Sequence, residues 1–159
     1  MQDLRVIAIS LPFFIKNEAE KISRILSEEA DIFHLRKPHS SLEEMERLLN
    51  EIPEEFYPRI KLHDNFSLLE KYPLGGVHLN SRCPEYHGVA GSVSCSAHSV
   101  EQLIGAKHYD YITLSPIFDS ISKKGYKSAF DIETLRPILK ERRVVALGGV
   151  TPEKFPLLR

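Results

Sequence analysis

The stretch Val144-Val145-Ala146-Leu147-Gly148-Gly149-Val150-Thr151-Pro152-Glu153 runs from an apolar segment through two glycines into a helix-start pattern. Its apolar residues predict a buried strand, and Thr151 before Pro152 predicts the N-cap and first residue of a helix. Paired glycines let a phosphate approach backbone N–H groups, and a helix N-terminus favours the anion. A tight strand-to-helix turn would use the same residues, so the pattern alone leaves phosphate binding and a plain turn both open.

Apolar segments of the same kind alternate with helix-periodic segments along the rest of the chain. Such alternation is typical of βαβ units and predicts an α/β fold with a parallel sheet. Ser41 lies three residues before Glu44, a capping-box spacing that predicts a helix start. The expected strands are Arg5–Ile9, Ile32–Arg36, Arg59–His63, Gly76–Leu79, Ser92–Ser96, Tyr109–Leu114 and Val144–Leu147, and the expected helices are Glu18–Glu29, Ser41–Glu51, Phe66–Lys71, Val100–Lys107 and Asp131–Lys140.

Several predicted strands carry polar side chains on one face only. In Ile32–Arg36, the period of two places His34 and Arg36 opposite Phe33 and Leu35. A doubly wound sheet buries both faces under helices, whereas a closed barrel uses inward polar groups near its strand ends to line an active site. We therefore expect a (β/α)8 TIM barrel forming one domain over residues 1–159. The same alternation places Ser92, Ser94, Ser96 and His98 on one face of the fifth predicted strand. It also places Thr113 and Ser115 on one face of the sixth.

The expected barrel lacks its last strand–helix unit, because the chain to Arg159 supplies seven predicted strands. A (β/α)8 barrel needs an eighth unit, and an open edge between its first and last strands would promote aggregation. Either the chain continues past Arg159 or another chain closes the gap. A homo-oligomer is therefore one expected state.

Composition and charge exclude several classes of function. Lys plus Arg number 21 against 22 Asp plus Glu, so no overall positive field is present to attract nucleic acid or an anionic membrane. The apolar run Val6–Ile15 is too short to span a bilayer. Cys83 and Cys95 lack metal-site spacing, and we expect both to be packing residues. We expect a cytoplasmic enzyme acting on small phosphorylated molecules, with neither nucleic-acid nor membrane partners.

Two strand ends in the first half carry candidate phosphate and metal ligands. Arg36 faces inward, where it would bind a phosphate bidentately or form a structural ion pair. Lys37 points the other way and is predicted to be an ordinary surface residue. Asp64 would hold Mg2+ beside phosphate oxygens, or it would act as the N-cap of a helix that starts at Phe66.

The loop after the sixth predicted strand offers hydroxyl and ammonium groups that suit a phosphate or pyrophosphate. Ser120, Ser122, Lys123 and Lys124 lie within five residues, although a solvated basic loop would have the same composition. At the end of the fifth strand, His98 shares the inward face and would act as a general acid or base near neutral pH. His78 is predicted to be a core histidine with satisfied hydrogen bonds.

Taken in order, these segments resemble the thiamine phosphate synthase and thiazole tautomerase superfamily, and thiamine phosphate synthase most closely. Four motifs carry the resemblance: Gly76-Val77-His78-Leu79, Ser96-Ala97-His98-Ser99, Pro116-Ile117-Phe118 with Ser120-Ile121-Ser122-Lys123, and Val145-Ala146-Leu147-Gly148-Gly149-Val150. The resemblance implies a (β/α)8 barrel that joins an aminopyrimidine-methyl pyrophosphate to a thiazole phosphate with Mg2+, giving thiamine phosphate and pyrophosphate.

The resemblance also implies roles for individual residues. Arg36, Ser96 and Lys123 would hold the leaving pyrophosphate, and Asp64 would bind Mg2+. Ser120, Ser122 and Gly149, beside Gly148, would hold the thiazole phosphate. His34 and His63 stand where the family has the glutamine and asparagine of its substrate-binding motifs, so they are expected to contact substrate.

One departure from the family pattern keeps an alternative open. The family's second metal aspartate corresponds to Cys83, a poor ligand for a hard cation. Thiazole tautomerase shares the barrel and phosphate site without the metal machinery, and it uses a histidine at the position of His98. Retention of Arg36, Asp64 and the Ser120–Lys123 loop favours the synthase. A third alternative is a non-catalytic barrel that binds thiazole phosphate or thiamine phosphate.

Overall fold

The computed structural model describes residues 5–106, 108–119, 128, 130–139 and 143–158. Contacts divide the chain into two compact units, Met1–Ser92 and Val93–Arg159, here called unit 1 and unit 2. Each unit consists of parallel strands that alternate with helical segments, so the predicted α/β class is confirmed.

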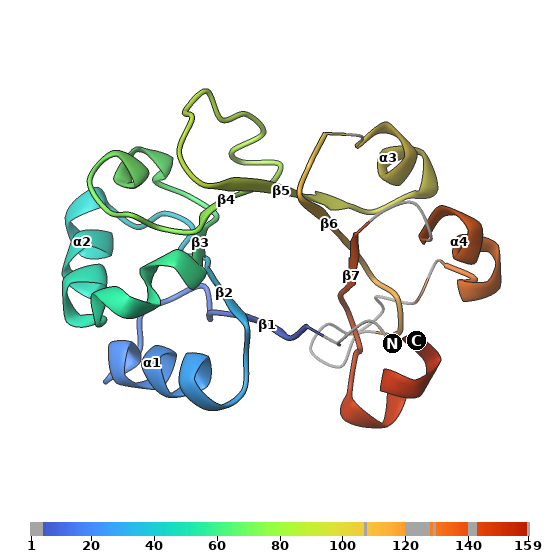
Figure 1. The fold of residues 1–159 in the computed structure, drawn as a ribbon, viewed down its shortest axis with the longest axis horizontal. Helices are drawn as coiled ribbons and strands as arrows, with labels where there is room; N and C mark the ends of the chain where they lie inside the picture. The colour runs from blue at the N-terminus through green and yellow to red at the C-terminus, as the bar shows by residue number, and fades with distance from the viewer. Residues whose placement is uncertain (1–4, 107, 120–127, 129, 140–142, 159) are drawn as a thin grey trace. The chain divides into compact units, whose positions relative to one another are not determined.

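Among its described residues, unit 1 contains four strands joined by helical connections on one side, as Figure 1 shows for α1 and α2. Neighbouring strands pair in parallel, with Ala8 opposite Phe33 and Leu35 opposite Leu62. The core between strands and helices is formed by residues such as Ile22, Leu26 and Met45. The elements are β1 (Ile7–Ile9), α1 (Glu18–Glu28), β2 (Ile32–Leu35), α2 (Leu42–Glu51), η1 (Glu54–Arg59), β3 (Ile60–Leu62), η2 (Phe66–Glu70) and β4 (Gly76–Leu79).

Helix α2 illustrates how local sequence fixes an element. The Ser41 side chain accepts a hydrogen bond from the Glu44 N–H, and the Glu44 carboxylate accepts one from the Ser41 N–H. This capping box satisfies two backbone donors that the helix itself leaves unpaired, as the sequence predicts. Met45, Leu48 and Leu49 then form the buried stripe that packs the helix into the core.

Unit 2 continues the same alternation with three strands. Its strands also pair in parallel, with Ser96 opposite Thr113 and Thr113 opposite Val145. Helix α3 begins after Ser99, whose side chain accepts a hydrogen bond from the Gln102 N–H. The elements are β5 (Ser92–Ala97), α3 (Val100–Gly105), β6 (Tyr111–Leu114), α4 (Ile132–Leu139), β7 (Val144–Ala146) and η3 (Pro152–Leu158).

Most predicted boundaries agree with the structure to within two residues, and three differences are informative. The predicted helix Phe66–Lys71 is a 3-10 helix over Phe66–Glu70, and the 3-10 segment Glu54–Arg59 was not predicted. Helix η3 begins at Pro152, so Thr151 has the predicted N-cap position, although the helix is 3-10. Within the described part of the chain, no helix has the length and hydropathy needed to cross a bilayer.

Candidate functional site

In unit 1, hydrogen bonds join the loop that follows each strand to the loop that follows the next. The Ser10 hydroxyl accepts from the Arg36 N–H at 2.8 Å and donates to the Arg36 carbonyl at 3.0 Å, which joins the ends of β1 and β2. Asn65 donates to the Ser40 hydroxyl at 3.1 Å, and Asn80 donates to the His63 carbonyl at 2.7 Å. These contacts fix the backbone at the carboxyl ends of the strands, where barrel enzymes bind substrates.

Lys37 is buried, so the prediction of an ordinary surface residue is wrong. Its ammonium donates to Glu18 at 2.6 Å and to the carbonyls of Leu11 and Phe13 at 2.9 and 2.6 Å. The Lys37 and Glu18 side chains are only 1% and 6% exposed. Helix α1 supplies the carboxylate that pairs with this buried ammonium.

Three histidines of unit 1 form one buried cluster. The Nδ1 of His34 lies 2.8 Å from the Nε2 of His63, and the His63 and His78 rings stack with centroids 4.4 Å apart. Burial, followed by the neighbouring histidine and cationic charges, lowers the pKa of His63 to about 2. Burial and Lys61 lower the pKa of His78 to about 4, and burial also holds the pKa of His34 well below its usual value. All three imidazoles are therefore neutral at pH 7.

Neutral imidazoles can bind a transition metal or the ring of a heteroaromatic substrate. The ligand nitrogens of the three histidines lie within 4.8 Å of one another, which is close enough for one metal ion. However, Arg36, Lys61 and Arg82 are close enough to lower the histidine pKa values. These three positive charges would repel a bound metal cation. The cluster therefore suits an uncharged ring next to an anion better than it suits a metal ion.

Asp64 forms an ion pair with Arg82 and does not cap the following helix. Asn65 precedes η2 in a left-handed conformation, which contradicts the N-cap alternative for Asp64. The Nε and Nη2 of Arg82 donate to Oδ1 of Asp64 at 3.2 and 3.0 Å. Asp64 thus lies at the end of β3, as predicted, with its carboxylate already paired to a cation.

The residues around Asp64 do not fit Mg2+. Magnesium prefers carboxylate oxygens and water in a near-octahedral shell. The Asn80 side-chain oxygen accepts from the N–H groups of Arg82 and Cys83, at 3.0 and 3.3 Å. Burial and the nearby Asp64 carboxylate raise the pKa of the Cys83 thiol, which favours its neutral form. The available ligands are therefore a carboxylate in an ion pair with arginine, an amide oxygen that already accepts hydrogen bonds, and a thiol. This is a poor ligand set for a hard cation.

In unit 2, hydroxyl groups connect the ends of β5 and β6. The Nδ1 of His98 lies 3.1 Å from the Ser115 hydroxyl and 3.2 Å from the Ser115 carbonyl oxygen. The Thr113 hydroxyl donates to the Ser96 hydroxyl at 3.4 Å. The predicted residues Ser96 and His98 therefore lie at the strand ends, and His98 is exposed to solvent.

The two glycines after β7 are required by close backbone packing. Gly148 and Gly149 have φ values of 91° and 62°, in the region that favours glycine. A Cβ atom on Gly149 would lie 2.1 Å from the Asp119 carbonyl oxygen, and one on Gly148 would lie 2.9 Å from Pro116. The Phe118 N–H also donates to the Gly148 carbonyl at 3.0 Å. The tight-turn explanation is sufficient for these glycines, and phosphate binding stays a prediction.

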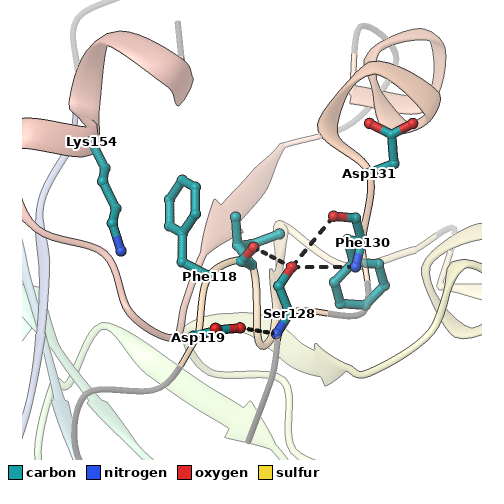
Figure 2. Close-up of a pocket in the computed structure, with 7 residues that line it drawn as sticks. Phe118, Asp119, Ser128, Phe130, Asp131 and Lys154 are labelled. Atoms are coloured by element: carbon teal, nitrogen blue, oxygen red, sulfur yellow. Dashed lines mark hydrogen bonds between the residues drawn. The ribbon is translucent and has the colours of Figure 1, made fainter.

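A pocket of about 490 Å3 opens beside this turn, entirely within unit 2. Lys154 donates to the Gly149 carbonyl at 2.6 Å, and its ammonium lies 4.5 Å from the centre of the Phe118 ring. Figure 2 shows Lys154 and Phe118 on one side of the pocket and Asp131 on the opposite side. The Ser128 N–H donates to the Asp119 carboxylate at 2.8 Å, which links two of the residues that line the pocket.

The predicted site residues that the structure describes are divided between the two units. Ser120, Ser122 and Lys123 lie outside the described residues, so their predicted roles are untested. Sequence reasoning missed Ser10, Lys61, Arg82 and Lys154. Only Arg82 could have been found from the sequence, because it is adjacent to Cys83, which replaces the family's second metal aspartate.

Parallel strands that alternate with helical segments and carry polar groups at their carboxyl ends are typical of TIM-like α/β enzymes. The chain belongs to the thiamine monophosphate synthase family, whose model matches residues 6–159. A crystal structure of thiamine phosphate pyrophosphorylase from Bacteroides thetaiotaomicron is 38% identical, with a TM-score of 0.85. That match covers 98% of this chain and 77% of the other. A search of curated protein sequences found no significant match.

Proposed function

We propose that the protein is a transferase of the thiamine phosphate synthase type. It joins 4-amino-2-methyl-5-hydroxymethylpyrimidine pyrophosphate to hydroxyethylthiazole phosphate and releases pyrophosphate. The observation that carries this proposal is the polar cluster at the strand ends of unit 1, which contains His34, His63 and the Asp64–Arg82 ion pair, in a chain of this family. Neither the family match nor the solved structure favours the tautomerase or the non-catalytic barrel.

The proposed reaction breaks a carbon–oxygen bond and forms a carbon–nitrogen bond. The electron pair of the broken bond leaves with the pyrophosphate, and the thiazole nitrogen donates its pair to the pyrimidine methylene carbon. Positive charge placed beforehand around the leaving group lowers the barrier, because it costs no reorganisation during the reaction. We assign this role to Arg36, whose backbone Ser10 fixes at the end of β2. Ser96 and Lys123 assist it in this proposal.

The neutral histidines suit the pyrimidine half of the same substrate. An aminopyrimidine ring is uncharged near neutral pH and offers donor and acceptor groups at its edge. We propose that His34 and His63, whose buried rings lie against each other at the ends of β2 and β3, contact this ring. Their lowered pKa values keep them neutral, so they add no positive charge beside the developing methylene cation.

The thiazole phosphate is assigned to unit 2. Ser120, Ser122 and the backbone at Gly148 and Gly149 would bind its phosphate, because glycines let a phosphate approach backbone N–H groups. We also propose a complete (β/α)8 barrel as the active form. The described strands would provide seven of its eight strands.

Arg36→Ala tests the division of roles between the two units. Loss of a fixed cation from the leaving-group site should lower kcat about 100- to 1000-fold, as measured by thiamine phosphate formation. Thiazole phosphate binding, measured by calorimetry, should stay unchanged. Arg47→Ala is the control, because Arg47 is an exposed arginine of α2. Loss of thiazole phosphate binding in Arg36→Ala would contradict the assignment.

A further inference from the structure

Arg82 provides a fixed positive charge beside Asp64. The Asp64 side chain is only 12% exposed, and a carboxylate this far removed from water is stabilised by a charged partner. Arg82 supplies that partner through Nε and Nη2, and the Arg82 side chain itself remains 33% exposed. The pair therefore spans from a buried carboxylate to the accessible surface of unit 1.

The Arg82 guanidinium retains hydrogen-bonding capacity. A guanidinium has five N–H donors, and three of them belong to Nε and Nη2, which contact Asp64. The Nη1 nitrogen has no hydrogen-bond partner among the residues that the structure describes. Its donors are therefore available to an anion that approaches from solvent.

The loop after β4 holds Arg82 in place through its backbone. The Asn80 side chain accepts from the Arg82 N–H at 3.0 Å and donates to the His63 carbonyl at 2.7 Å. Arg82 is thereby linked to the end of β3, next to Asp64. A guanidinium fixed at both its backbone and its side chain loses little freedom when it binds a ligand, which favours tight binding.

We propose that Arg82 binds the pyrophosphate group of the substrate, and that its guanidinium supplies the positive charge beside Asp64 without a divalent cation. This inference rests on the proposed function and deepens it. Arginine is well suited to the task, because its planar N–H groups match phosphate oxygens. Asp64 then serves as a positioning residue that orients Arg82, and Arg36 contacts the same anion.

Binding of inorganic pyrophosphate to the purified chain in EDTA tests this inference without relying on turnover. Calorimetry should show binding by the unmodified protein in the absence of metal. Arg82→Gln should weaken it at least about tenfold, as expected for loss of a charge-assisted contact. Arg136→Gln is the matched control, because Arg136 is an exposed arginine paired with Glu133, and its affinity should stay within about twofold.

Two results would overturn the inference: binding that requires added Mg2+, or Arg82→Gln with unchanged affinity. Circular dichroism checks the fold of Arg82→Gln. Should that variant not fold, Arg82→Lys provides the same test, since an ammonium cannot bridge Asp64 and pyrophosphate as a guanidinium does. Metal-free pyrophosphate binding without thiamine phosphate formation would contradict the proposed function alone. Thiamine phosphate formation only with Mg2+ would contradict this inference alone.

Discussion

The two units build their strand-end sites by different means. In unit 1, charged and polar side chains are bonded to one another, as in the Lys37–Glu18 and Asp64–Arg82 pairs. In unit 2, the β6 and β7 ends are held by backbone packing around Gly149. Substitutions that remove side chains should therefore destabilise unit 1 most, whereas substitutions that add a side chain should destabilise unit 2 most.

The largest stability effect is expected from Lys37→Ala. Removing the ammonium leaves Glu18 buried without its partner, and breaking a buried pair in this way costs about 3–5 kcal/mol. Urea unfolding measures the change. Lys71→Ala is the matched control, because Lys71 pairs with Glu46 on the surface, and such exposed pairs contribute about 0–1 kcal/mol. If the two variants lost equal free energy of unfolding, burial would not be the reason that the Lys37–Glu18 pair stabilises the protein.

Gly149→Ala should produce the largest effect in unit 2, about 1–3 kcal/mol from backbone strain, because its Cβ would collide with the Asp119 carbonyl. Gly105→Ala is the control, since a Cβ there meets nothing within 4 Å. Thermal unfolding compares the two variants. If Gly149→Ala is as stable as Gly105→Ala, the backbone account of unit 2 is wrong.

The histidine cluster predicts that acid destabilises the protein from about pH 6.5 downwards. His78 has a lowered pKa of about 4 in the folded protein, whereas an unfolded histidine titrates near its ordinary value. Between these two values the unfolded chain binds the proton and the folded protein does not. Protonation therefore favours unfolding, and the free energy of unfolding falls by up to about 1.4 kcal/mol per pH unit for each such histidine.

Urea unfolding at pH 6.5 and 5.5 measures this slope. His78→Gln should make the slope shallower, because one proton-binding group is lost from the unfolded chain. A parallel fall in the two proteins would show that the buried cluster of unit 1 is not the cause.

The smallest effect is expected from His98→Ala. Its contact with Ser115 is a single exposed hydrogen bond, so the loss of stability should be about 1 kcal/mol or less. Under the proposed function, thiamine phosphate formation should slow without being abolished, because the reaction depends on charge and positioning more than on proton transfer. Complete loss of turnover would instead favour the proton-transfer role that the tautomerase needs.

Much of the fold could be predicted from the sequence, because its signals are local. The capping box at Ser41 and the strand Gly76–Leu79 both agree with the structure. The predicted helix at Phe66 failed as an α-helix because five residues are too few to offset the cost of helix nucleation. Asn65 also provides no side-chain cap that would help it start.

The site was less predictable, because its contacts join residues far apart in sequence. Strand alternation places Arg36 and Lys37 on opposite faces, but it cannot show that α1 brings Glu18 to Lys37. In the same way, the sequence indicates that Asp64 ends a strand, but not that Arg82 reaches it from the next loop. Ion pairs across 18 or 19 residues depend on the folded arrangement.

The most direct test of the account is a product assay on the unmodified chain. The protein is mixed with the pyrimidine pyrophosphate and the thiazole phosphate, once in EDTA and once with Mg2+, and both products are quantified by mass spectrometry. We predict that both products form in EDTA as well as with Mg2+, and that thiamine phosphate and pyrophosphate are equimolar in each condition. Absence of thiamine phosphate under both conditions, from a folded chain that binds thiazole phosphate, would contradict the proposed function.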